Sequence, residues 1–354
     1  MIPYILISLF PIILYPPYHK KMRSMDINVR NKAKKNYLVL CGIVLILFMG
    51  LRNPRLGSTD TVNYYNNMLR AISASSWSEY YVEDYFEGGF QLFVFLLSRV
   101  FKHAQALLFI TSAIYVFFIC FFIYRNSEDL VMSLVMYITL GLMTFEMQGM
   151  RQAIAMSICL LAYELLKSKK KWWFLLTVIL AMQFHRTAII FALVLLVFNL
   201  GYSTLKLIIV FLSSIVSLLL TDRIISLGNQ FFDRNYTYVK ETGGYVATLI
   251  YVLIFIFSVL FNRRLKTDKN QSAMFYVLSM GAISYLMRYT GVMIAERISF
   301  YFMFSQMAML PGSLRHIDGR NRAIIKITVH LLMILLFVYR LNGSDFLPYR
   351  FFWQ

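Results

Sequence analysis

The chain has 354 residues, of which 59% are hydrophobic and 15% charged, with a formal net charge of +18. A soluble domain carries about 25% charged residues, so this composition excludes an ordinary soluble protein and indicates a single polytopic membrane domain over residues 1–354. The positive charge would suggest nucleic acid in a soluble protein. In a membrane protein, anionic lipid headgroups account for it, and we expect no nucleic-acid partner.

The first part of the chain predicts helices over 2–18 and 36–51, separated by a cluster of lysines and arginines. A polar loop follows, and the apolar stretch at 88–101 is too short to cross a bilayer, which takes about 20 residues. We therefore read 52–103 as an outer loop that ends in an interfacial or re-entrant helix.

The region 172–200 is apolar except for His185 and Arg186 near its middle. One helix would place both residues at the bilayer centre, where charge costs several kcal/mol, so we predict two short helices that meet at His185 on the outer side. A second outer loop is expected over 222–245. The other predicted helices cover 104–124, 130–147, 149–166, 205–221, 246–261, 272–289, 297–314 and 323–340.

These segments amount to about 12 transmembrane helices, an all-α bundle. Lysine clusters such as Lys169 to Lys171 fall in one set of alternate loops, which the positive-inside rule assigns to the cytoplasm. Both termini are then expected outside. The basic cluster after residue 18 follows the first apolar segment rather than preceding it, which favours a retained first helix over a cleaved signal peptide.

Arginines at the outer ends of apolar segments are the first candidates for function, because cations at such positions are costly. Arginine stays ionised, and its planar fork suits phosphate, so the set predicts a site for a lipid-linked pyrophosphate. The alternative is that each arginine snorkels as an anchor or pairs with an acid such as Glu146 or Glu296. The strongest candidates are Arg52, Arg151 and Arg297, and the weaker ones are Arg288 and Arg186.

His185 is the first candidate for a general base, because a neutral imidazole accepts a proton near pH 7. Asp60 and Glu87, the acids closest to outer apolar segments, are the next candidates. A hydrogen-bonded core histidine and two solvated loop carboxylates are the alternatives. The aromatic loop between residues 64 and 86 either stacks on sugar rings or forms an interfacial aromatic belt.

Nothing in the sequence predicts a metal site or a cofactor. Cys41, Cys120 and Cys159 lie in apolar runs with no CxxC spacing and no nearby histidine. No phosphate-binding loop, dinucleotide fingerprint, zinc-protease or hydrolase-elbow pattern occurs, so ATP-coupled chemistry and zinc hydrolysis are unsupported.

Several stretches resemble, in order, the EpsG-type, Wzy-like family of bacterial polysaccharide polymerases. No single motif is specific, but the ordered set covers most of the chain, and one departure is Gly88, where many relatives have proline. The matching stretches are Gly50-Leu51-Arg52, Gly57-Ser58-Thr59-Asp60 with Tyr64-Tyr65, Glu87-Gly88-Gly89-Phe90, Met150-Arg151-Gln152-Ala153-Ile154-Ala155, Phe184-His185-Arg186-Thr187-Ala188, Arg297-Ile298-Ser299-Phe300-Tyr301-Phe302 and Pro348-Tyr349-Arg350-Phe351-Phe352-Trp353.

The resemblance implies a metal-independent glycosyltransferase of the bacterial inner membrane with a GT-C-like helical bundle. Such an enzyme transfers an oligosaccharide from undecaprenyl pyrophosphate to the terminal hydroxyl of another lipid-linked repeat unit, on the outer face. It implies membrane lipids and a chain-length regulator as partners. Arg52, Arg151 and Arg297 would then neutralise the departing pyrophosphate, and His185, with Asp60 or Glu87 behind it, would be the base.

Two other classes of function stay open on these residues. A transporter or lipid flippase would use the same arginines along a path, although the mostly apolar inner halves of the helices disfavour an aqueous route. The second class is another membrane transferase. A ligase that transfers the glycan to another acceptor fits the same residues. A membrane O-acyltransferase would more naturally place its histidine toward the cytoplasm.

Overall fold

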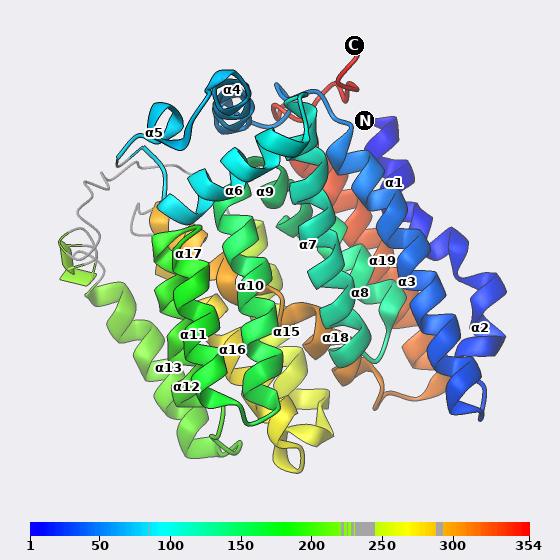
Figure 1. Ribbon diagram of the computed structural model, residues 1–354. Coiled ribbons are helices and arrows are strands. Elements are labelled where there is room, and N and C mark those ends of the chain that lie inside the picture. The colour runs from blue at the N-terminus through cyan, green and yellow to red at the C-terminus, as the bar shows by residue number, and fades with distance from the viewer. Residues whose placement is uncertain (84, 221–222, 225, 228–229, 231–244, 288–292) are drawn as a thin grey trace.

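The computed structural model describes residues 1–83, 85–220, 223, 224, 226, 227, 230, 245–287 and 293–354. In this part of the chain the fold is helical, and the sole β-type pairing is an isolated bridge between Arg52 and Phe351. Upright helices form a bundle, and α4 (Thr59–Ser73), α5 (Trp77–Tyr80) and α6 (Gly88–Val100) lie across one end of it (Figure 1). We call this the cap end, and both chain termini lie there as well (Figure 1).

The all-α fold class is confirmed. The remaining elements of the first half are α1 (Ile2–Leu14), α2 (Pro16–Met22), α3 (Ile27–Gly50), α7 (Gln105–Asn126), α8 (Leu130–Thr139), α9 (Leu142–Gln148) and α10 (Met150–Lys167). Those of the second half are α11 (Lys171–Met182), the 3-10 helix η1 (Arg186–Leu193), α12 (Val194–Val197), α13 (Thr204–Leu219), α15 (Tyr245–Phe261), the 3-10 helix η2 (Arg263–Lys266), α16 (Lys269–Leu286), α17 (Met293–Met303), α18 (Gln306–Leu314) and α19 (Gly319–Leu341).

Among the described residues, three helices are long and apolar enough to cross a membrane, namely α3, α7 and α19. The count rises to five if two bent pairs each act as one span, α1 with α2 (bent by 41°) and α8 with α9 (bent by 48°). Several other apolar helices have 10–17 residues. The number of about 12 crossings and the GT-C-like arrangement therefore stay predictions.

Three segments expected as single helices are broken. The one expected over 297–314 divides into α17, which ends at Met303, and α18, which begins at Gln306. The other two breaks have a local cause. The expected helix over 130–147 divides into α8 and α9 at Gly141, whose φ of +104° lies in the left-handed region that favours glycine. The expected helix over 2–18 divides at Tyr15, directly before Pro16 and Pro17, which cannot donate backbone hydrogen bonds. By contrast, the predicted break between 172 and 200 is confirmed, since α11 ends at Met182 and η1 begins at Arg186.

The end of the bundle opposite the cap holds its own ion pairs. Glu128 lies 2.6 Å from Arg264 and 2.8 Å from Arg315, and Glu164 lies 2.7 Å from Arg125. We call this the basic end, because the lysine and arginine clusters predicted to face the cytoplasm gather there. The predicted outer loop at 222–245 falls almost wholly outside the described residues.

Candidate functional site

The break between α11 and η1 carries His185, and the start of α6 packs against it. The backbone N–H of Phe90 donates to the Gln183 carbonyl at 3.1 Å. A Cβ atom on Gly89 would lie 2.7 Å from that carbonyl oxygen, so only glycine permits this approach. Gly89 therefore allows α6 to place its first residues beside His185.

The loop before α6 is held by one buried glutamine. The Gln91 amide donates to the carbonyls of Val82 and Phe86 at 2.8 Å, and its oxygen accepts the Val82 N–H at 3.1 Å. These bonds fold the loop back over the first turn of α6. As a result, Glu87, at the N-cap of α6, points into the bundle rather than into solvent.

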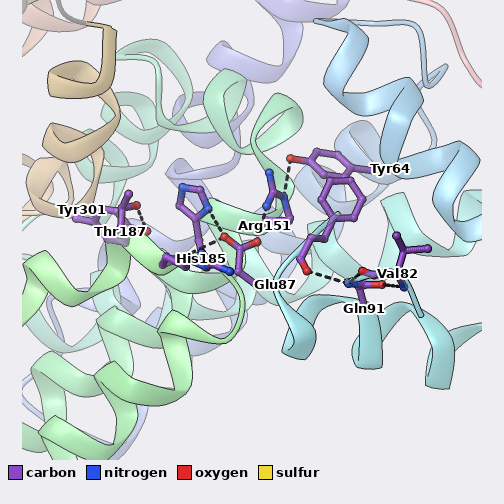
Figure 2. Close-up of polar contacts among 10 residues, drawn as sticks. Tyr64, Val82, Glu87, Gln91, Arg151, His185, Thr187 and Tyr301 are labelled. Atoms are coloured by element: carbon purple, nitrogen blue, oxygen red, sulfur yellow. Dashed lines mark hydrogen bonds and ion pairs between the residues drawn. The ribbon is translucent and has the colours of Figure 1, made fainter. Parts of the chain in front are cut away.

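Glu87 lies between a histidine and an arginine (Figure 2). One carboxylate oxygen accepts a hydrogen bond from Arg151, at the start of α10, in a close ion pair. The other is 3.3 Å from His185 Nδ1, a contact without full hydrogen-bond geometry, and also accepts the Arg186 N–H at 3.3 Å. The Glu87 side chain is only 8% exposed, so its charge is compensated by these two hydrogen bonds and the His185 contact rather than by water.

The Arg151 guanidinium is also fixed by two aromatic rings. It lies 4.5 Å from the Phe86 ring centre and 5.9 Å from that of Tyr64, and its Nε is 3.4 Å from the Tyr64 hydroxyl (Figure 2). Cation–π contacts of this kind add to the ion pair. Arg151 is thus held in one orientation by groups from α4, α6 and the loop between them.

This arrangement sets the protonation states of Glu87 and His185. Burial alone would raise the pKa of the Glu87 carboxyl, but His185 and Arg151 outweigh burial and hold the pKa at about 2. Burial lowers the pKa of His185 below its usual value, and Glu87 opposes that shift only in part. At neutral pH, Glu87 is ionised and the imidazole is neutral, so His185 can accept a proton.

A pocket of about 140 Å³ lies next to these residues. Its lining comes from α4, the α9–α10 junction, the His185 break and α17. The lining residues are Ser58, Asp60, Tyr64, Phe145, Gln148, Gly149, Arg151, Gln152, His185 and Arg297.

Of the two arginines that line the pocket, Arg151 and Arg297, the second makes the weaker ion pair within the protein. Its side chain is 49% exposed, and its guanidinium is 4.0 Å from the Asp60 carboxylate, at the limit of an ion pair. The Gln152 amide donates to the Arg297 carbonyl at 2.5 Å, which fixes the backbone of α17 while leaving the side chain free to move. An incoming anion can therefore bind Arg297 without breaking a buried contact.

The structure brings together five of the eight predicted site residues. Asp60, Arg151, His185 and Arg297 line the pocket, and Glu87 contacts Arg151 and His185. Arg186 contributes its backbone N–H to Glu87. Arg288 lies outside the described residues.

Arg52 differs from the prediction of an outward-facing phosphate ligand. It is 1% exposed and does not line the pocket. Its guanidinium donates to the carbonyls of Met49 and, at 2.6 Å, Met147, while the Gln105 amide donates to the Arg52 carbonyl at 2.9 Å. These bonds satisfy the carbonyls at the ends of α3 and α9, so in this structure Arg52 joins two helix ends.

Sequence reasoning missed the pocket wall formed by the α9–α10 junction. Phe145, Gln148, Gly149 and Gln152 recur at a spacing of three, one and three residues, and they belong to the end of α9, the break at Gly149 and the first turn of α10. That spacing was visible in the sequence beside Arg151. The Gly57 carbonyl, which accepts from the Gln148 amide, ties this wall to the loop before α4, and Asp60 lies in the first turn of that helix.

Within the described part of the chain, no three His, Cys, Asp or Glu side chains are grouped so that they could hold a metal ion. The charged side chains that line the pocket are Arg151, Arg297 and Asp60, and Glu87 lies against Arg151 and His185. The chemistry this arrangement supports is proton removal by a neutral imidazole next to cations that can bind an anion.

Comparison with known proteins gives one match. The family model described as the EpsG family matches residues 35–351, which is nearly the whole chain and includes every pocket residue. No curated protein and no solved structure matches the chain.

Proposed function

Because this chain belongs to the EpsG family, we propose that it is a membrane glycosyltransferase that polymerises polysaccharide repeat units. Its donor would be an oligosaccharide on undecaprenyl pyrophosphate, and its acceptor the terminal hydroxyl of a second lipid-linked unit. The observation that carries the proposal is the neutral His185, held beside the buried Glu87–Arg151 ion pair at a pocket that Arg297 also lines.

In the proposed reaction, the acceptor hydroxyl enters the pocket and His185 Nε2 takes its proton. The hydroxyl oxygen bonds to the anomeric carbon of the donor sugar as the bond from that carbon to the pyrophosphate oxygen breaks. The leaving group gains negative charge as it departs, and Arg297 and Arg151 are the cations available to stabilise it. His185 then releases the proton to water or to the pyrophosphate. No metal ion is needed for this step.

Glu87 acts through His185 in this scheme. Its carboxylate faces Nδ1, which favours the tautomer with the proton on Nδ1 and leaves the lone pair on Nε2. It also stabilises the imidazolium that forms on proton transfer. Asp60, half exposed beside Arg297, fits a role in binding sugar hydroxyls.

The cap end would face the outer side of the bacterial inner membrane. Two features support this orientation: the lysine clusters gather at the basic end, and the pocket is built under the α4–α6 cap. A polyprenyl-linked substrate could then keep its tail in lipid while its pyrophosphate reaches the pocket at the interface.

The test is polymerisation by purified protein in nanodiscs with lipid-linked repeat units from the host strain, EDTA present, and products resolved by size. We expect a ladder of polymers whose formation Arg297→Gln and His185→Gln strongly reduce. Arg55→Gln is the matched control, because Arg55 is an exposed arginine of the cap end outside the pocket. Unextended substrate from folded wild-type protein would rule out the polymerase, and a single transfer to another acceptor would indicate a ligase.

A further inference from the structure

A second hollow lies on the bundle, away from the pocket. It is an apolar groove of about 360 Å³ between α15 and α19, with α18 at its floor. Every lining side chain is hydrophobic, and Leu253, Leu332 and Leu260 are 54%, 60% and 68% exposed, so the groove opens on the surface of the bundle. Its lining is Leu140, Ile250, Leu253, Ile254, Ile256, Phe257, Leu260, Leu310, Ile325, Val329, Leu332, Met333 and Leu336.

The groove runs along the bundle rather than across it. On α15 its lining extends from Ile250 to Leu260, and on α19 from Ile325 to Leu336. At 1.5 Å per residue, each wall is roughly 15 Å long, about half the hydrocarbon core of a bilayer. A linear hydrocarbon chain lying parallel to the helices fits this shape.

Arg340 lies at one end of the groove, the end that is nearer to the cap end of the bundle. Together with Leu336, Met333 and Val329 it is spaced at i, i+4, i+7 and i+11 along α19, so it shares the face that lines the groove. Its guanidinium packs on Gly141: a Cβ there would lie 3.0 Å from one terminal nitrogen and 3.2 Å from the other. Gly141 directly follows Leu140, which itself lines the groove.

Arg340 makes no ion pair or side-chain hydrogen bond with any residue that the structure describes. A guanidinium that ends an apolar groove without an acidic partner is complementary to an amphiphile with an anionic head. At the groove's other end, Lys326 is already paired with Asp129, so the unpaired cation is at the cap end. The head group is therefore expected at the cap end and the tail along the groove.

One short helix separates this arginine from the pocket. Gly141 precedes the first turn of α9, and Phe145 and Gln148 of the same helix line the pocket. Seven helical residues span about 10 Å. An anion on Arg340 is thus roughly one helix length from the groups assigned to the transfer step.

From these contacts we infer that the groove between α15 and α19 holds the start of the prenyl chain of the lipid-linked substrate, with a phosphate of its head on Arg340. This inference rests on the proposed function for the identity of the lipid. Arg340 is then a substrate-binding residue that holds the head group before it enters the pocket lined by Arg151 and Arg297.

The experiment is photo-crosslinking of the full-length protein in nanodiscs with a sugar-free prenyl pyrophosphate that carries a diazirine near its head. We expect labelled peptides from α15 and α19, and competition by unlabelled prenyl pyrophosphate. Val329→Trp, which fills the groove, should abolish this labelling. Leu331→Trp is its control, because Leu331 lies on the same helix, is 57% exposed and does not line the groove.

Arg340→Gln should weaken prenyl pyrophosphate binding about tenfold, the effect of losing one charge-assisted contact, while Arg55→Gln leaves it unchanged. Equal labelling by a phospholipid that carries the same diazirine, without competition by prenyl pyrophosphate, would show a general lipid groove and overturn the inference.

The polymer assay separates this inference from the proposed function. If the groove is labelled specifically but the protein makes no polymer, the prenyl-binding groove is supported and the proposed polymerase function is refuted. If Val329→Trp gives a normal polymer ladder and the label is found elsewhere in the protein, the inference about the groove is refuted and the polymerase function is retained.

Discussion

Glu87→Gln is the sharpest test of the site, because it removes the charge of a buried group that is paired with Arg151 and faces the neutral His185, and it changes the shape of the side chain very little. The pKa of Glu87 is about 2, against 4.5 for a free glutamate. A difference of that size corresponds to about 3 kcal/mol in favour of the ionised form. Replacement by a neutral amide is therefore expected to lower the free energy of unfolding by about 2–3 kcal/mol, since Arg151 loses its partner.

The same change should alter the pH dependence of activity. Glu87 raises the pKa of His185 against the effect of burial, so its removal lowers the pKa of His185 further. The acid limb of kcat/KM reports protonation of the base in the free enzyme. In Glu87→Gln this limb should move to lower pH, with a lower maximum rate because the imidazolium is no longer stabilised.

The assay is the initial rate of polymer formation across a pH series, with thermal unfolding measured on the same samples. In the wild type, the contribution of Glu87 to stability is complete above pH of about 4.5 and is lost as the pH falls toward about 2, because its folded pKa is depressed. An acid limb that stays in place, or moves to higher pH, in a folded Glu87→Gln protein would refute the assignment of His185 and Glu87 as a pair.

Substitutions at three further residues test other parts of the structure. Arg297→Gln should lower kcat by roughly 10²-fold without changing the unfolding temperature, because its side chain is half exposed, and Arg297→Lys should recover part of the rate. Arg52→Gln should do the reverse: unfolding becomes easier by about 1–3 kcal/mol, while the activity of the folded fraction is retained. If Arg52→Gln instead lowers kcat without changing stability, Arg52 would be a phosphate ligand, as predicted from the sequence. Gly141→Ala should cost about 1–3 kcal/mol in unfolding experiments, since alanine is strained at a φ of +104°, and unchanged stability would contradict the described turn.

Much of the helical layout follows from apolar periodicity and charge. The break at His185 was predictable because a histidine and an arginine cannot both lie at mid-bilayer in one helix. The break at Gly141 was not predicted, because an apolar run looks continuous whatever the φ of one glycine within it. Its physical cause, a left-handed backbone at that glycine, became evident only in three dimensions.

The candidate site was predicted as separate residues rather than as an arrangement. Glu87, Arg151 and His185 were each singled out, yet nothing local in the sequence pairs Glu87 with the other two. That pairing depends on α6 packing against the Gln183 carbonyl. Arg52 shows the opposite case: its position after an apolar helix suggested exposure, but the convergence of α3 and α9 buries it.

The docking of α6 also governs how the site can be lost. Glu87 is the N-cap of α6, so any shift of this short helix moves the carboxylate away from Arg151 and His185 at the same moment. On its other face, α6 exposes Leu92 and Leu96, which are 47% and 55% exposed and lie one turn apart, where lipid would press against them. A detergent that solvates this face differently from lipid would shift α6 and separate Glu87 from Arg151 and His185, while the bundle stays helical. A preparation with a normal circular dichroism spectrum would then be inactive until it is returned to a bilayer.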